Sequence, residues 1–284
     1  MPTAKAVMHG AVSIVNAIAT GKGATLGISL NVESTIEATQ GSGIVFENKE
    51  SSLSSRLIKN VIEKAVPKTD LEKTKLRIFL KSEIPSGYGL KSSSAISSAI
   101  SLACAKLFRP QINDFEVLRH GVEASIESKV SITGAYDDAC ACYFGGFVVT
   151  DNHNLKIVKS EKAPEDLSAV IFIPKSRKRG DVKKLKILEG VFAQAWSLAS
   201  NSDYWNAMLL NGLATSTILN SDPRILTDLV EAGALAASVS GNGPSIAAVT
   251  KKGNVPSVKK AFSSREGTTI VSDINNKKAE VYEV

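Results

Sequence analysis

Cysteine and histidine are scarce in this sequence, which has three of each among 284 residues. Cys140 and Cys142 are separated by one residue, and an odd count with this spacing excludes the disulfide framework of a small secreted module. The histidines do not lie at ligand spacing from the cysteines, which argues against a structural zinc site. We therefore expect the cysteines to be small buried core residues.

Long apolar runs are also missing, and aromatic residues make up only 6% of the chain. No run approaches the roughly 20 apolar residues that a membrane span requires, so we expect no membrane association. The first ten residues carry no apolar core ending in a small-residue cleavage site, which makes the cytoplasm the expected location. The net charge of +6 fits nucleic acid or anionic metabolites. A basic RNA-binding protein is thus an alternative of a different class, although no basic-aromatic stripe supports it.

The chain length favours two modest domains with a cleft between them. No linker marks a boundary, but the charge density rises beyond Asp151 and a buried-strand run begins at Ala169, so we place the boundary near residue 155. The predicted domains are residues 1–155 and 156–284. Helices mixed with antiparallel strands predict an α+β fold in both halves.

Hydrophobic periodicity predicts a strand over 75–81 and a helix over 92–108, joined by a loop of glycine and serine. Asn113 and Glu116 form a capping-box pattern before a second helix that reaches about residue 128. A polar turn over 131–138 and a strand over 147–150 follow. The second half predicts a strand over 169–173, helices at about 181–199, 203–219 and 223–232, a strand-turn-strand around 240–244, one short helix and terminal strands.

The loop between the first strand and the first helix carries the clearest chemical signal. Glycines permit unusual backbone angles, and a loop that opens into a helix directs backbone N–H groups and the positive helix end toward one point, which suits an anion. The serines add hydroxyls for phosphate or magnesium. It is not a Walker A loop, because Leu90 rather than glycine precedes the Lys91-Ser92 pair. The candidate phosphate-binding residues are Pro85, Ser86, Gly87, Tyr88, Gly89, Leu90, Lys91, Ser92, Ser93, Ser94 and Ala95.

Two further segments are ambiguous when considered alone. Asp137 and Asp138 lie at the end of the polar turn, where an ordinary surface turn or cap is the common role of such a pair. The segment around Gly241 and Gly243 is by itself a hairpin between apolar strands. The basic run from Lys175 to Arg179 is either a solvated loop or an anion site.

Together and in this order, these segments resemble the motifs of the GHMP kinase family. The central motif, Pro-x-x-x-Gly-Leu-x-Ser-Ser-x-Ala, is matched without a gap by residues 85–95. The third motif is matched by residues 241–245, and an acid-base turn before a Gly-Gly pair by Asp137, Asp138 and residues 145–146. Lys5 and Gly10 match the N-terminal motif weakly, so the resemblance spans residues 5–245.

Within the family, the chain is most similar to the archaeal-type shikimate kinase branch. The similarity lies in residues 16–23, in Lys91 of the serine run, and in residues 133–140. Ala11 stands where mevalonate-type members carry an acidic residue, which disfavours mevalonate. Homoserine kinase, or another GHMP metabolite kinase, remains the alternative, because it would share every motif and differ only in the acceptor.

The resemblance implies a fold with an N-terminal domain like part of ribosomal protein S5 and a ferredoxin-like C-terminal domain. It implies transfer of the γ-phosphoryl group of ATP, with Mg²⁺, to a hydroxyl of shikimate. The expected partners are this small molecule and, as an option, a second copy of the chain, with no nucleic acid and no membrane.

The resemblance also assigns residue roles. An aspartate would accept the proton of the acceptor hydroxyl; Asp138 is preferred and Asp137 is the alternative. Ser93 and a helix glutamate would hold the metal, Glu127 by spacing or Glu123 one turn earlier. The expected substrate-binding residues are Asn16, Lys22, Arg177, Arg179, Gly241 and Gly243, and spacing does not choose which cation would hold the substrate carboxylate.

Overall fold

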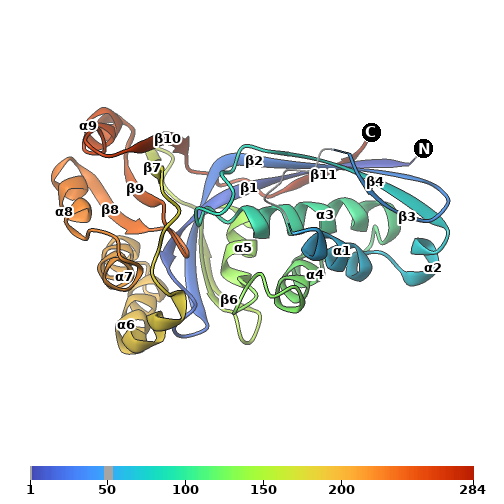
Figure 1. The fold of residues 1–284 in the computed structure, drawn as a ribbon, viewed down its shortest axis with the longest axis horizontal. Helices are drawn as coiled ribbons and strands as arrows, with labels where there is room; N and C mark the ends of the chain where they lie inside the picture. The colour runs from blue at the N-terminus through green and yellow to red at the C-terminus, as the bar shows by residue number, and fades with distance from the viewer. Residues whose placement is uncertain (1, 48–53) are drawn as a thin grey trace.

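A computed structural model describes residues 2–47 and 54–284. The chain forms two β-sheets, each with its own helices, and they lie side by side along the long axis of the molecule (Figure 1). Both termini lie at the end of the first sheet that is distant from the second sheet (Figure 1). Within the described residues, none of the helices is both long and apolar enough to cross a bilayer.

The first sheet has seven strands in the order β11-β1-β2-β4-β3, with β5 pairing β2 and β6 pairing β5. Among the described strands of this sheet, the β3–β4 pair alone is parallel. The 19-residue strand β2 organises this sheet, because its first residues pair with β5 and its second half pairs with β4. The strands are β1 (Thr3–Val15), β2 (Lys22–Gln40), β3 (Gly43–Phe46), β4 (Thr74–Ser82), β5 (Phe147–Asp151), β6 (Lys156–Glu161) and β11 (Glu280–Glu283).

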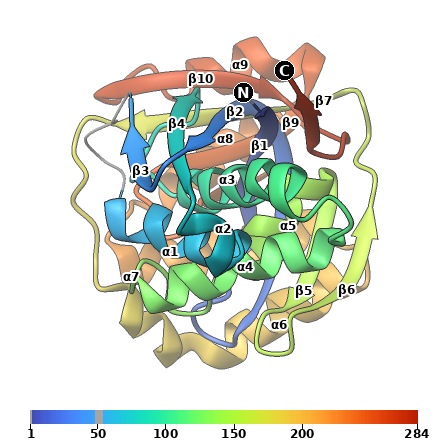
Figure 2. The same cartoon turned by 90° about the vertical axis from the view of Figure 1, so that its right-hand side faces the viewer.

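Helix α3 (Ser92–Phe108) packs directly on β1 and β2, and it is buried along most of its length. Its alanines and serines are small enough to let the helix approach the sheet closely. Helices α1 (Ser55–Ala65) and α4 (Asp114–Glu127) cover its outer side (Figure 2), α5 (Tyr136–Phe144) packs against β1, β2 and β5, and α2 (Lys68–Leu71) is a short turn before β4.

Strand β1 changes its surroundings along its length. Up to His9 its buried and half-buried residues alternate, as in a strand with one face in the core, and from Gly10 onward every residue is buried. The strand packs against α3 and α5 from the first half of the chain and against α6 and α7 from the second half, and Ser13 in its second part contacts both Lys91 and Ser240. This part of β1 therefore lies between the two halves of the molecule.

The second sheet has four antiparallel strands in the order β10-β7-β9-β8. Along the chain they alternate with helices as strand, helices, strand, strand, helix, strand, which confirms the predicted ferredoxin-like domain. The elements are β7 (Leu167–Pro174), the 3₁₀ helix η1 (Val182–Leu188), α6 (Glu189–Ser200), α7 (Tyr204–Leu219), α8 (Arg224–Glu231), β8 (Ala234–Val239), β9 (Ile246–Lys251), the 3₁₀ helix η2 (Lys252–Asn254), α9 (Val255–Lys260) and β10 (Gly267–Asp273).

The predicted elements correspond closely to the observed ones, with one correction. The strand over 75–81 is β4, the helix over 92–108 is α3, and the Asn113 cap of α4 is confirmed, since its side chain accepts a hydrogen bond from the Glu116 N–H at 3.0 Å. The polar turn expected over 131–138 is wrong at its end, because α5 begins at Tyr136 and the two aspartates lie in its first turn. The short apolar stretch that follows gave too few residues for a helical period to be recognised.

The division into domains at residue 155 stays a prediction. The boundary between the two sheets does not fall at residue 155, because β6 and β11 both follow that residue and both belong to the first sheet.

Candidate functional site

The loop before α3 has an unusual backbone. Gly87, Gly89 and Lys91 all have positive φ angles, of +82°, +81° and +67°. The first two are glycines, for which this conformation is easy, whereas Lys91 adopts it as the residue that precedes α3. The left-handed step at Lys91 directs the chain into the helix and keeps the lysine side chain at the helix N-terminus.

Two serines of the β8–β9 loop hold this glycine loop from the second half of the chain. The Ser240 hydroxyl donates to the Gly89 carbonyl at 2.9 Å, and the Ser245 hydroxyl donates to the Tyr88 carbonyl at 2.6 Å. The C=O of a trans peptide and the N–H of the next residue point in opposite directions, so these bonds turn the Gly89 and Leu90 N–H groups away from the hairpin. A Cβ atom on Gly89 would lie 1.9 Å from the Ser240 carbonyl oxygen. Glycine at this position is therefore required by the hairpin.

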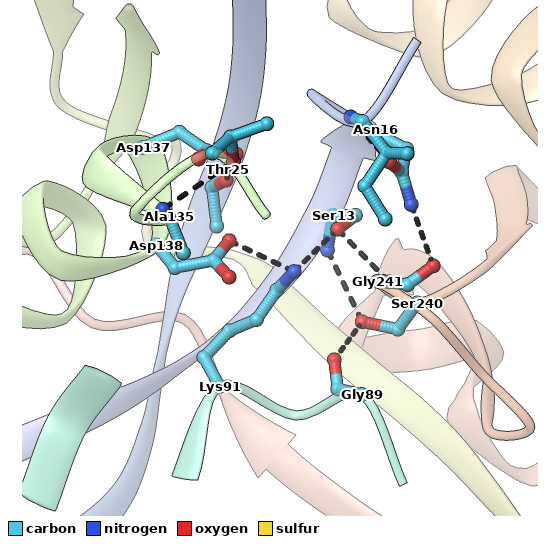
Figure 3. Close-up of polar contacts among 12 residues, drawn as sticks. Ser13, Asn16, Thr25, Gly89, Lys91, Ala135, Asp137, Asp138, Ser240 and Gly241 are labelled. Atoms are coloured by element: carbon cyan, nitrogen blue, oxygen red, sulfur yellow. Dashed lines mark hydrogen bonds and ion pairs between the residues drawn. The ribbon is translucent and has the colours of Figure 1, made fainter. Parts of the chain in front are cut away.

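The two aspartates of α5 have different surroundings. Asp137 is buried, and its carboxylate accepts hydrogen bonds from the Asn152 amide at 2.7 Å and the Thr25 hydroxyl at 3.2 Å. Gly23 leaves the space for it, since a Cβ there would come within 2.3 Å of Asp137 Oδ2. Asp138 points instead toward the glycine loop (Figure 3).

Asp138 forms an ion pair with Lys91, in which Oδ1 lies 2.8 Å from Nζ. The same amino group donates to the Ser13 hydroxyl at 2.7 Å, so that it lies between strand β1 and helix α5 (Figure 3). Burial and the negative charge of neighbouring Asp137 raise the pKa of Asp138 to about 7, although Lys91 acts in the opposite direction. The side chain thus exchanges a proton near neutral pH, as a general base does.

A cavity of about 350 Å³ opens between these elements. Its walls come from β1, the glycine loop, the start of α3, the segment between α4 and α5, and the β8–β9 loop. From the predicted phosphate-binding set, the lining includes Gly87, Gly89, Lys91, Ser92, Ser93 and Ser94. Leu90 and Ala95 are buried in the core, and the Tyr88 ring stacks under the Arg177 guanidinium, with 4.9 Å between its Cζ and the ring centroid.

The predicted substrate residues separate into those that line the cavity and those that do not. Asn16 and Gly241 line it and bind each other, through the Asn16 amide and the Gly241 carbonyl at 2.8 Å. Arg179 also lines it, and donates to the carbonyls of Asn242 and Gly243 at 3.2 Å each. Lys22 does not line it and lies over the Trp196 ring, with Nζ 4.6 Å from the centroid.

Glu127 and Ser93 are not brought together as the predicted metal pair. Glu127 accepts from Lys64 Nζ at 2.6 Å on the outer side of α4, and Glu123 lies 3.4 Å from the same nitrogen. Ser93 does line the cavity, but neither glutamate does. Among residues 2–47 and 54–284, no group of three or more His, Cys, Asp or Glu side chains is arranged to hold a metal ion. Helix α4 directs both glutamates toward Lys64 of α1, and their metal role stays a prediction.

Three polar residues of the site were missed by the sequence-based predictions. Thr25 and Asn152 hold Asp137, and Ser13 accepts from Lys91. Ser13 has a recognisable signal, because it is a polar residue within the apolar end of β1, and buried polar groups in such runs normally have specific partners.

The comparisons with known proteins agree with this geometry. Residues 56–146 match the GHMP kinases N terminal domain. The chain is 35% identical over 277 residues to the shikimate kinase of Methanobrevibacter smithii, covering 94% of this chain and 95% of the relative. It is 37% identical over 280 residues to the shikimate kinase of Methanosarcina mazei, covering 95% of this chain and 94% of that relative.

Solved structures show the same fold. A homoserine kinase from Cytophaga hutchinsonii superposes with a TM-score of 0.75 at 19% identity, covering 99% of this chain and 97% of that one. The mevalonate kinase of Methanococcus jannaschii superposes with a TM-score of 0.75 at 17% identity, covering 96% of this chain and 98% of that one. These likenesses concern the fold alone, but the curated relatives are similar over nearly the whole chain, and the chain belongs to the GHMP kinase family.

Proposed function

We propose that this protein is a shikimate kinase that transfers the γ-phosphoryl group of ATP to a hydroxyl of shikimate. One observation carries the proposal: the Lys91–Asp138 ion pair lies inside a cavity that is bounded by a glycine-serine loop and a helix N-terminus. This arrangement combines an anion site with a base, and the chain carrying it is 35% to 37% identical to two curated shikimate kinases over most of its length.

The nucleotide phosphates would bind at the start of α3. The N–H groups that the hairpin turns away from itself, together with those of the first helical turn, supply donors for phosphate oxygens. Phosphoryl transfer requires mainly positioning and charge neutralisation. The Lys91 ammonium adds a fixed positive charge beside the helix end.

Asp138 would accept the proton of the substrate hydroxyl. Its pKa of about 7 leaves a large ionised fraction at neutral pH while keeping the carboxylate basic enough to take a proton. Asp137 already accepts two hydrogen bonds from neighbouring side chains, so we assign it the role of fixing the start of α5.

The oxygen ligands available in the cavity fit a Mg²⁺ ion that arrives bound to ATP. Mg²⁺ in kinase sites keeps several waters and is bound by the nucleotide phosphates and only one or two protein oxygens. The Ser93 hydroxyl lines the cavity and is the candidate protein ligand. When bound, the metal would neutralise charge on the phosphates.

Arg179 is the cation we assign to the substrate carboxylate. It lines the cavity, whereas Lys22 lies over Trp196 and Arg177 over Tyr88. Its Nη1 is held by two backbone carbonyls, which leaves its other N–H groups for a carboxylate.

The test is ADP release from ATP and Mg²⁺ with shikimate, homoserine, mevalonate and galactose as acceptors. We expect shikimate to have a kcat/KM at least about tenfold above that of homoserine. The Asp138→Asn variant serves as the control that the activity belongs to this chain. Faster turnover of homoserine would assign the protein to another GHMP activity, and ADP release that is independent of every acceptor would refute the proposal.

A further inference from the structure

Ser13 is one of the residues that line the cavity, although no motif includes it. Ser13 lies in the second half of β1, where both halves of the chain cover the strand, and only 1% of its surface is exposed. Figure 3 shows its side chain between the Lys91 amino group and the Gly241 backbone.

The hydrogen bonds of the Ser13 hydroxyl leave only its donor proton available. Ser13 Oγ accepts from Lys91 Nζ at 2.7 Å and from the Gly241 N–H at 3.0 Å. An ammonium and a backbone amide can only donate, and a serine hydroxyl has two acceptor positions and one proton. Both acceptor positions are therefore filled, and this hydroxyl can make a further bond only as a donor.

The Ser13 proton has no acceptor in the part of the chain that the structure describes. A buried donor without a partner is costly, and native structures rarely keep one. Because Ser13 lines the cavity, a ligand can supply the acceptor.

The position of Ser13 indicates which ligand this is. Lys91 Nζ lies between Ser13 Oγ and Asp138 Oδ1, at 2.7 and 2.8 Å. A substrate whose reacting hydroxyl faces Asp138 would thus bring its neighbouring oxygens to Ser13. A substrate ammonium could not accept the Ser13 proton and would be repelled by Lys91.

We propose that Ser13 is a specificity-determining residue that donates a hydrogen bond to a hydroxyl oxygen of the acceptor substrate, next to the hydroxyl that is phosphorylated. Ser13 and Lys91 then form a donor-only surface that favours polyhydroxylated acceptors over aminated ones. This inference rests on the proposed shikimate kinase function and assigns a residue to its substrate specificity.

The experiment is calorimetric titration of wild type and Ser13→Ala in the presence of a non-hydrolysable ATP analogue. The ligands are shikimate and a set of deoxy analogues, each of which lacks one of the hydroxyls that are not phosphorylated. We expect shikimate to bind Ser13→Ala roughly tenfold more weakly, with the affinity for the ATP analogue retained. One deoxy analogue should bind wild type with a similar loss, and should bind both proteins equally.

Ser240→Ala is the matched control. The Ser240 hydroxyl accepts from the Ser13 N–H at 3.2 Å and donates to Gly89, but Ser240 does not line the cavity. It should weaken nucleotide binding more than shikimate binding.

Shikimate affinity within about twofold of wild type in Ser13→Ala, or equal losses for shikimate and the ATP analogue, would overturn the inference. If Ser13→Ala does not fold, the deoxy analogues still test the inference with wild type alone. The inference is overturned if every analogue binds wild type as tightly as shikimate does. Absence of shikimate binding to wild type would instead refute the proposed function, and with it the ligand assigned to Ser13.

Discussion

Replacing Lys91 by methionine should shift the pH dependence of catalysis. The change keeps a long side chain but removes the cation that lies 2.8 Å from Asp138 Oδ1. Lys91 lowers the pKa of Asp138, against the effects of burial and of Asp137, which raise it. Without Lys91 the pKa of Asp138 must therefore rise above its present value of about 7.

The size of the effect follows from the ion pair. An opposite charge at this distance typically lowers a carboxyl pKa by roughly 1 to 3 units. In wild type about half of Asp138 is ionised at pH 7, and a rise of that size would leave roughly a tenth to a thousandth ionised. Since the base must be ionised to accept a proton, kcat/KM for the acceptor at pH 7 should fall by about 5- to 500-fold.

The assay is the pH dependence of kcat/KM for the acceptor in ADP release, which reports groups of the enzyme before the acceptor binds. In wild type kcat/KM should rise with pH through a midpoint near 7, and in Lys91→Met this limb should move to higher pH. Lys64→Met is the matched control, because Lys64 also pairs with carboxylates, Glu123 and Glu127, but outside the cavity. An unchanged midpoint in Lys91→Met, or the same shift in Lys64→Met, would refute the reasoning.

Three further sets of variants test the site. Asp138→Asn should lower kcat by roughly 10²- to 10⁴-fold while ATP affinity in calorimetry stays near wild type, and a loss below tenfold would contradict its role as the base. Asp137→Asn should cost less in kcat but should lower Tm in thermal melts more than Asp138→Asn does, because an amide NH₂ replaces one of the two buried acceptor oxygens. The opposite order would exchange the two roles. Gly89→Ala should raise the KM for ATP because it brings a Cβ against the Ser240 carbonyl. Ser245→Ala should raise this KM by about tenfold because it releases the glycine loop. Unchanged KM values would show that the hairpin does not position this loop.

Local patterns predicted most of the fold. The alternation of residues 75–81 and the helical spacing of 92–108 depend on which face is buried, and that information is local. The first turn of α5 was missed because the helix has nine residues and is buried on most sides, so its apolar run has no clear period.

Motif and backbone signals bring out candidate residues where a residue acts through its backbone or its place in a motif. The glycine loop and Asp138 are such candidates, and the structure places both on one cavity. The metal role of Glu127 stays a prediction, because spacing along a helix does not show which way that face points, and here both glutamates lie near Lys64 of α1. The choice of Arg179 over Lys22 also depended on tertiary packing, since only the structure places Lys22 over Trp196.

The contacts that complete the site join segments that are 151 to 228 residues apart in sequence, which explains why they were not predicted. Ser13 binds the Gly241 N–H and Asn16 binds its carbonyl, so one peptide of the β8–β9 loop is held on both sides by the end of β1. The same loop holds the glycine loop through Ser240. The glycine loop and Lys91, which pairs with Asp138, are therefore positioned by one connected hydrogen-bond network that includes both halves of the chain. A change in the distance between the halves would alter the directions of the loop amides and the contacts of Lys91 together, because Ser13 contacts both Lys91 and Gly241.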